Sequence, residues 1–578
     1  MASYTRRDFI RRSMAGAGAL GLSTAAKPTQ VAAATYGLGL QNARSSAQGS
    51  SARPAKLEVT QNVIRKQFAG VGFHTEMFLN SSTDDFFEQV TAKRWRELNP
   101  RFARMWHSWA PGKPGIRNPQ ALDALARQLL FMKNNSDTVA YVTTSGLKDT
   151  VGKEDNLAYA RSVVDDLEYL VNKGATNLKY YCCTNELSLD EWASLHNDLP
   201  RFQQYQQYIY NEMTKRGLGI KLLATDASPI SYWDTIEWAA QHMDNITGIY
   251  GGHHYINGHS PDDLTFYDWF RSKCDWAVGI ARSKGKDFIL GEFGPAQYQV
   301  LKYGIRWDTC KYFGTPLESL AGLQLAEAAI AAINAGVYGM GYWTFMDYPD
   351  EKGSESINHW GAFKWMTNDA VTRTPYYSYG LLTKFFRGPA TVFEVTAGNE
   401  NLRVAAVQHE DDKAWSVAVV NRDTHDVPLT ISLAGSNSSR AFRKYVYDTR
   451  HIPVTEDGDL QGPEGKVALY RGKLSDTVRG SSLTVYTTAY DDEPPAPVTG
   501  MEVSRIYDTR LPGWPAEANL VKWNPSTDRD FCYYRVYHNG VRIGSTTTNE
   551  FIDAGPTVRS QSGYSIVVVD QSGNASRS

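Results

Sequence analysis

Two glutamates stand at the ends of short apolar segments, in surroundings that suggest catalysis. Glu186 closes the segment Lys179–Glu186, where Asn185 directly precedes it. Glu292 lies in Phe288–Gly294, whose sequence is Phe-Ile-Leu-Gly-Glu-Phe-Gly. Hydrolysis of a glycosidic bond requires one carboxylic acid and one carboxylate on either side of the bond. The sequence therefore predicts that Glu186 and Glu292 form a catalytic pair.

Such a pair must be held by strands that end side by side. Strand and helix patterns alternate from about residue 56 to 387, and Glu186 and Glu292 close the fourth strand and the seventh. In a (β/α)8 barrel the carboxyl ends of all strands meet at the catalytic face, so the pattern predicts this barrel. No Gly-rich dinucleotide motif follows the first strand, which argues against a Rossmann fold. The expected strands are 68–74, 102–107, 138–143, 179–186, 220–225, 248–255, 288–294 and 338–347.

The helical periodicity disappears after Gly388, and strand patterns separated by polar turns replace it. Residues 388–490 predict a β-sandwich, to which Leu57–Thr60 adds a strand. The following Asp-Asp-Glu-Pro-Pro-Ala-Pro sequence, residues 491–497, predicts a stiff acidic linker.

The last segment, residues 498–578, carries Asn539-Gly540 between alternating apolar residues, a strong hairpin pattern. The segment resembles a fibronectin type III module. The expected fold class is therefore α/β, with a (β/α)8 barrel at 56–387, a β-sandwich and a C-terminal fibronectin type III-like β-sandwich.

Residues 1–34 have the features of an export signal. Thr5–Arg11 is similar to the twin-arginine motif, and an apolar run rich in Ala and Gly follows it. Ala32–Ala34 offers small residues for cleavage. These features predict a secreted protein that uses the twin-arginine export machinery, with residues 35–55 as a disordered linker. The apolar run is too short to span a membrane stably.

The composition limits the kinds of ligand and partner that the protein is expected to bind. A net charge of −2 over 578 residues provides no basic surface for nucleic acid. The five cysteines are too few for a disulfide framework and have no metal-binding spacing, so we expect neither a metal nor a cofactor. An aromatic content of 12% suits stacking on sugars but also suits large cores.

Together, the Asn-Glu of strand four and the Glu of strand seven resemble the clan A glycoside hydrolases. The likeness covers the architecture of residues 68–385, and the following β-sandwich is similar to that of families 39, 30 and 51. It implies that Glu186 is the acid/base and Glu292 the nucleophile of a retaining mechanism. It also implies that Asn185 binds the 2-hydroxyl group of the sugar.

Four further residues fit the same clan pattern. Arg104 is a charged residue in an apolar strand, and Glu292 is the natural partner for its buried charge. His253 and Tyr255 share one face of strand six and resemble the clan's His-x-Tyr, in which the tyrosine donates to the nucleophile and the histidine lines the pocket. Trp343 on strand eight resembles the clan's sugar-stacking tryptophan.

Two functions remain open from the sequence. The first is a secreted glycosidase that cleaves poly- or oligosaccharides. The alternative is a non-catalytic carbohydrate-binding or adhesion protein that kept the barrel. The presence of both Glu186 and Glu292 favours catalysis. An aldolase or isomerase is disfavoured, because no Gly-rich phosphate loop follows strands seven and eight.

Overall fold

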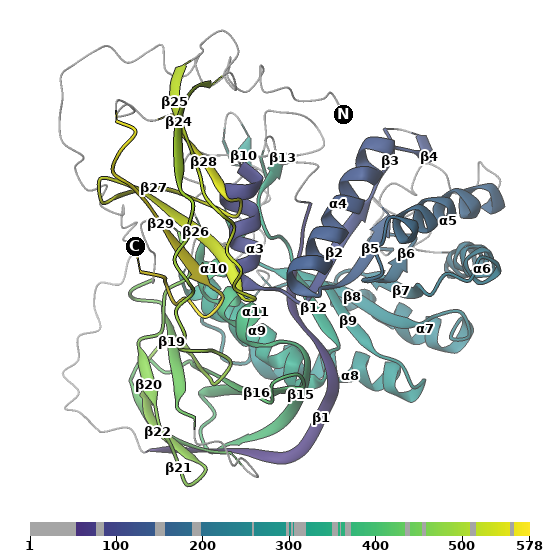
Figure 1. Ribbon diagram of the computed structural model, residues 1–578. Helices are drawn as coiled ribbons and strands as arrows, with labels where there is room; N and C mark the ends of the chain where they lie inside the picture. Colours follow the sequence, from purple (N-terminus) through teal and green to yellow (C-terminus); the bar gives the residue numbers. More distant parts are fainter. Residues whose placement is uncertain are drawn as a thin grey trace.

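The computed structural model describes residues 54–577 apart from several internal segments (Figure 1). The predicted signal at 1–34 and nearly all of the predicted linker at 35–55 lie outside the described residues. The internal segments outside the description are 77–85, 112, 145–155, 188–197, 257–258, 296–299, 302–303, 306–318, 350–356, 359, 364–371, 434–439, 453–457, 509–515 and 555–559.

A closed ring of eight parallel strands lies at the centre of the molecule. Each strand pairs with the next, and the last pairs again with the first through Gly339–Tyr342 and Gly70–Phe73. The ring agrees with the predicted barrel, although the eighth strand ends at Tyr342 instead of residue 347. The strands are β1 (Ala55–His74), β2 (Phe102–His107), β5 (Val139–Thr144), β6 (Leu178–Cys182), β7 (Lys221–Ala227), β8 (Ile249–Tyr255), β9 (Phe288–Gly294) and β12 (Gly339–Tyr342).

Helices follow the strands and cover the outside of the ring (Figure 1). Asn118 and Asp198 cap two of them by accepting hydrogen bonds from backbone N–H groups three residues later. Gly174, predicted to end a helix, has a φ of 100°, which glycine adopts without strain. The helical elements are η1 (Phe87–Thr91), α3 (Ala92–Leu98), α4 (Pro119–Ser136), α5 (Asn156–Asn172), α6 (Leu199–Lys215), η3 (Ile230–Tyr232), α7 (Asp234–His242), α8 (Phe266–Ser283), α9 (Ser319–Ala335), α10 (Thr374–Tyr377) and α11 (Tyr379–Phe385).

Short strands lie within the connections of the barrel, where the sequence predicted none. One pair forms a hairpin, and the others form a small four-stranded sheet in the order β11-β10-β14-β13. They are β3 (Trp109–Ala110), β4 (Lys113–Arg117), β10 (Val300–Leu301), β11 (Gly304–Ile305), β13 (Tyr348–Pro349) and β14 (Ile357–Asn358).

A second β region follows the barrel, at the residues where helical periodicity is lost. Its central strands are buried on both faces, because Val404 packs into a cluster inside the region while Val407 packs toward the barrel. The Ala-rich helix α9 lies against it, and Asn334 donates to the carbonyl of Val404 at 2.8 Å. The strands are β15 (Arg387–Ala397), β16 (Leu402–His409), β17 (Trp415–Asn421), β18 (Val427–Leu433), β19 (Phe442–Asp448), β20 (Gly465–Val467), β21 (Leu469–Tyr470), β22 (Lys473–Val478) and β23 (Ser482–Thr487).

Strand β1 belongs to both the ring and the second β region. Its first residues pair with β15 and β18, and its last residues pair with β2 and β12. The pairing with β15 shifts register repeatedly between Val59 and Gly70. The sequence predicted two separate strands, 57–60 and 68–74, and the structure joins them into one. The predicted extra strand thus pairs with the second β region and ties it to the barrel.

The C-terminal β region consists of two three-stranded sheets, β24-β25-β28 and β27-β26-β29. They enclose a hydrophobic cluster that includes Trp523, Tyr534 and Val568. The predicted Asn539-Gly540 hairpin joins β26 to β27, and both residues have positive φ angles, 52° and 77°, as a type I′ turn requires. The strands are β24 (Glu502–Asp508), β25 (Ala516–Lys522), β26 (Phe531–His538), β27 (Val541–Thr546), β28 (Glu550–Asp553) and β29 (Tyr564–Asp570).

This C-terminal region packs against helix α3 of the barrel (Figure 1). The buried Asp459 accepts a hydrogen bond from Tyr533 at 3.0 Å and pairs with Lys93 of α3. Farther along, the backbone N–H of Asp491 donates to the hydroxyl of Ser572 at 3.0 Å. These contacts anchor the region to the rest of the chain, whereas the sequence predicted only a stiff spacer before it.

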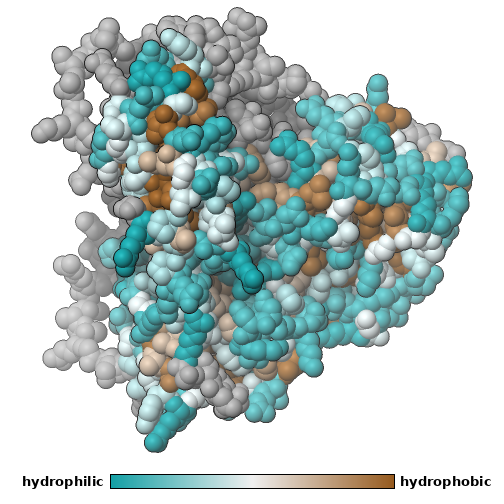
Figure 2. All heavy atoms as spheres, viewed as in Figure 1, coloured by the Kyte–Doolittle hydropathy of each residue, from teal (hydrophilic) through white to brown (hydrophobic). Residues whose placement is uncertain are grey.

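The face of the molecule in Figure 2 is mainly hydrophilic, with small apolar patches on the barrel and the C-terminal region. Across the described part of the chain, no helix combines the length and apolar character needed to cross a membrane.

Candidate active site

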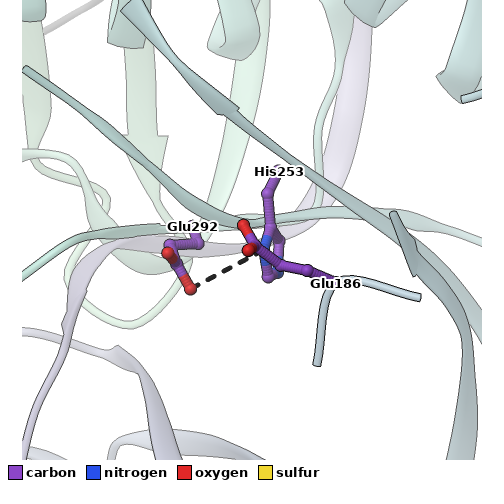
Figure 3. A group of neighbouring side chains, drawn as sticks. All are labelled: Glu186, His253 and Glu292. Carbon is purple, nitrogen blue, oxygen red and sulfur yellow. Dashed lines mark hydrogen bonds and ion pairs between the residues drawn. The ribbon is translucent and has the colours of Figure 1, made fainter. Parts of the chain in front are cut away.

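Glu186 lies beyond the end of β6, which stops at Cys182 instead of the predicted residue 186, and Glu292 lies within β9. Their carboxylate groups are turned toward one another beside His253 of β8 (Figure 3). One oxygen of each glutamate and one ring nitrogen of His253 all lie within 4.8 Å of one another. The two glutamates are 7% and 4% exposed, so they are largely shielded from solvent. Glu186 has a φ of 49°, an uncommon value outside glycine that recurs at functional sites.

Glu292 is held by two hydrogen-bond donors. Arg104 Nη1 donates to its Oε2 at 2.9 Å, and the hydroxyl of Tyr255 donates to its Oε1. His253 Nδ1 lies 3.6 Å from Oε2. Burial raises the pKa of Glu292, while His253, Arg104 and Tyr255 oppose that rise by stabilising the carboxylate. These three groups offset part of the effect of burial, and the pKa of Glu292 remains above its usual value.

Arg104 is fully buried on β2 and connects several parts of the site. Its Nη2 donates to Asn185 Oδ1 at 2.5 Å and to Asp226 Oδ2 at 3.2 Å. Its Nη1 also contacts His74 Nδ1 at 3.1 Å. Burial alone would lower the pKa of Arg104, but the carboxylates of Asp226 and Glu292 raise it above its usual value. Arg104 is therefore a permanent cation at the centre of this network.

His253 lies between three carboxyl groups. Its Nε2 is 2.7 Å from Asp226 Oδ1, and its Nδ1 is 3.3 Å from Glu186 Oε1. Burial opposes protonation, but Asp226 and Glu292 raise the pKa of His253 to about 9. The sequence predicted that His253 would line the pocket. Its side chain is fully buried and contacts the carboxyl groups of Asp226 and Glu186.

Asp226 and His74 belong to this network, although the sequence analysis did not single them out. Asp226 ends β7 and is fully buried with a φ of 60°. Burial would raise the pKa of Asp226, but His253 and Arg104 hold it below its usual value. His74 ends β1, and burial and Arg104 keep its pKa well below the usual value. Their one sequence signal is a polar residue at the end of an apolar barrel strand.

Aromatic rings adjoin the network on one side. Trp343 is buried just beyond the end of β12, with its ring centroid 4.1 Å from that of His74 and 5.8 Å from that of Trp106. The predicted Trp343 therefore lies beside His74, which in turn contacts Arg104. The neighbouring His254 points the other way, against Trp269 and Phe270 of α8, because successive side chains of a strand face opposite sides.

Glu186, His253 and Glu292 offer ligand atoms close enough for a metal ion. A metal-binding histidine must present an unprotonated nitrogen. Asp226 Oδ1 occupies Nε2 of His253, and the raised pKa of about 9 keeps the ring protonated near neutral pH. The Arg104 guanidinium also borders the group. This donor set is suited to proton transfer and fits a metal poorly.

Comparison with known proteins adds little at the level of sequence. No family model matches the chain. An α-amylase from Niallia circulans is 28% identical over 122 residues, which make up 19% of this chain and 9% of that protein. The chain thus matches less than a tenth of the length of this curated relative.

Solved structures match over most of the chain. Xylanase Xyn30A of glycoside hydrolase family 30 from Clostridium acetobutylicum has a TM-score of 0.53 at 14% identity and covers 75% of this chain and 99% of its own. The catalytic domain of the GH30 xylanase C from Talaromyces cellulolyticus has a TM-score of 0.54, with the same identity and coverage. A bacterial orthologue of human α-L-iduronidase has a TM-score of 0.54 at 13% identity and covers 90% and 98%. These three are glycoside hydrolases. At such identities the likeness concerns the fold.

Proposed function

We propose that the protein is a retaining glycoside hydrolase, with Glu292 as nucleophile and Glu186 as general acid and base. The observation that carries the proposal is the short separation of the pair, whose nearest oxygens lie within 4.8 Å. Retaining enzymes hold the two carboxyl groups about 5–5.5 Å apart, whereas inverting enzymes need about 6.5–9.5 Å to admit a water molecule. The pair therefore favours double displacement.

The reaction proceeds in two steps. Glu292 attacks the anomeric carbon, the bond to the leaving oxygen breaks, and Glu186 gives that oxygen its proton. A glycosyl ester on Glu292 results. In the second step Glu186 takes a proton from water, the water attacks the anomeric carbon, and the ester bond breaks. Two inversions at one carbon give net retention.

The hydrogen bonds support this assignment of roles. Glu292 accepts from Arg104 and Tyr255, and both contacts stabilise its charged form. Asn185 turns its carbonyl oxygen to Arg104, which leaves its amide nitrogen as the group that donates to a sugar hydroxyl. Trp343 supplies an apolar ring for stacking on the sugar.

The proposed substrate is an oligo- or polysaccharide. The alignment with the iduronidase orthologue covers 90% of the chain, which exceeds residues 1–490, so it reaches into the C-terminal β region. The two three-stranded sheets of that region enclose a hydrophobic cluster of their own, which supports a three-part organisation with a fibronectin type III-like module at the C-terminus. Arg6 and Arg7 support secretion of the folded enzyme by the twin-arginine route.

A panel of nitrophenyl glycosides tests this proposal. We expect turnover of at least one member, and at least a thousandfold loss in Glu292→Gln, because the substitution removes the nucleophile but keeps the shape. Glu58→Gln is the matched control, since Glu58 is exposed on β1, and it should behave like the parent protein. Sugar binding without turnover across the panel would instead support the non-catalytic alternative.

A further inference from the structure

Asp226 joins the two cations that face the nucleophile. Its Oδ1 accepts from His253 Nε2 at 2.7 Å, and its Oδ2 accepts from Arg104 Nη2 at 3.2 Å. Those same cations face Glu292 Oε2, at 3.6 Å from His253 and 2.9 Å from Arg104. Both carboxylate oxygens of Asp226 thus accept hydrogen bonds from cations that also face Glu292.

The surroundings of the His253 ring suit a proton on each nitrogen. An ionised carboxylate only accepts hydrogen bonds, so Nε2 must carry a proton toward Asp226. Nδ1 faces Glu186 Oε1 at 3.3 Å and Glu292 Oε2 at 3.6 Å. A proton on Nδ1 can be donated to whichever of the two glutamates carries the negative charge. The geometry therefore fits the imidazolium cation.

The backbone is built to make room for this pair. A Cβ atom on Gly291 of β9 would lie 3.1 Å from His253 Nε2 and 3.3 Å from Asp226 Oδ1, so a side chain there would press on their hydrogen bond. Asp226 itself has a φ of 60°, a strained value that the surrounding structure must hold. A buried residue that only fills space in the core would require neither a glycine opposite it nor a strained φ.

We infer that Asp226 is a positioning residue that keeps His253 as a cation between the two glutamates, so that the buried site stays neutral through both steps. The inference rests on the proposed function for its catalytic meaning. Asp226 reaches the reacting atoms only through His253 and Arg104.

Counting the charges shows why this arrangement suits a retaining enzyme. Arg104 and His253 are positive in the resting site. Asp226 and Glu292 are negative, and the protonated Glu186 is neutral. When the ester forms, Glu292 loses its charge and Glu186 gains one. The total is zero in both states, and His253 lies within 3.6 Å of either glutamate. No uncompensated charge is buried at either step.

Other titratable groups around Asp226 and His253 do not change the net charge of the site. His74 of β1 has a pKa well below its usual value because of burial. Tyr141 of β5 has a pKa well above its usual value, and burial raises that of Cys182 of β6 to about 12. All three are therefore neutral near pH 7. Tyr255 of β8 donates its hydroxyl to Glu292.

Titration of His253 followed by NMR tests the inference directly. The chain has 12 histidines, so selective ¹⁵N labelling gives a small set of signals, and His253→Gln assigns the relevant one. We expect the parent protein to keep both ring protons of His253 through neutral pH and to lose one near pH 9. In Asp226→Asn, which keeps the shape, the midpoint should fall by about 1–3 units. Asp263→Asn is the control and should move His259 instead.

Two results would overturn the inference: a neutral His253 at pH 7 in the parent protein, or an unmoved midpoint in Asp226→Asn. The first of these results is measured on the parent protein, so it tests the inference even if the Asp226→Asn variant fails to fold. Activity provides a second readout, because the loss of kcat/KM in Asp226→Asn should grow from pH 6 to pH 9, whereas a purely structural defect lowers it evenly. A protein without glycosidase activity would refute the proposed function and leave the titration result standing.

Discussion

Tyr255 and Arg104 give the two glutamates different surroundings, and the proposed roles of the pair follow from this difference. Both donate to Glu292, whereas the contact of Glu186 in this network is with His253. Hydrogen bonds to the charged form of a buried carboxylate offset part of the rise in pKa that burial causes. This difference in hydrogen bonding is the basis for proposing Glu292 as the nucleophile and Glu186 as the group that transfers the proton.

Replacing Tyr255 with Phe should weaken that separation. The hydroxyl of Tyr255 lowers the pKa of Glu292 against the effect of burial, so its removal raises the pKa further. The nucleophile must be ionised, and the acidic limb of the kcat/KM profile should therefore move to higher pH. A hydrogen bond to a charged group contributes about 1.5–3 kcal/mol, which corresponds to roughly a tenfold to hundredfold loss in kcat/KM. Tyr232→Phe, at an exposed position on η3, should change neither quantity. An acidic limb that stays in place in Tyr255→Phe would contradict this role.

The glutamates were readable from the sequence because each follows a recognisable apolar strand. Asn185 and the His-x-Tyr of β8 added a pattern that narrowed the chemistry. Asp226 has no such pattern, since one acid in Ala-Thr-Asp-Ala resembles any strand end. Its importance arises from His253 and Arg104, which stand on other strands and reach it only after folding.

At the level of elements, alternating strands and helices were sufficient to predict the ring, because each βα unit carries its own local periodicity. The length of β1 was not predictable in this way. Its middle residues, such as Asn62 and Lys66, are polar and exposed, so no apolar pattern connects its two ends. Pairing of Val63 and Arg65 with β15 keeps this stretch extended. Among the short strands of the connections, β10 likewise pairs with β14, a partner distant in sequence.

At the level of the whole molecule, Asp459 connects three parts of the chain. It pairs with Lys93 of the barrel, and from the C-terminal region it contacts Tyr533 and lies 3.2 Å from Arg542. These cations hold the pKa of Asp459 at about 2 against the effect of burial. The unfolded value is near 4, so the stabilisation is present above that pH and is lost as the pH falls toward 2. Such long-range pairing of charges has no sequence signature.

Replacing Asp459 with Ala should loosen the C-terminal region. The change leaves the Lys93 ammonium buried without this partner, at a cost of about 3–5 kcal/mol in the free energy of unfolding. We expect a lower Tm and faster proteolytic cleavage near residues 491–497. The parent protein should approach the variant's stability as the pH falls from about 4 to 2. Glu517→Ala is the control, because its pair with Arg505 is exposed and contributes little. Equal cleavage rates for the parent protein and the Asp459 variant would show that the contact does not hold the region in place.

The central claim, that Glu292 attacks and Glu186 transfers the proton, is tested by azide rescue on an activated aryl glycoside. The good leaving group of this substrate needs little protonation, so Glu186→Ala should still form the glycosyl ester and then stall without a base. Azide needs no base and should release a glycosyl azide of retained configuration. Glu292→Ala lacks the nucleophile, so azide should enter its place and give the inverted product.

The configuration of the two glycosyl azides, read by NMR, is therefore the decisive measurement. We predict retention from Glu186→Ala and inversion from Glu292→Ala. Exchanged configurations would show that the two roles are reversed, and failure of azide to rescue either folded variant would contradict the assignment of both glutamates.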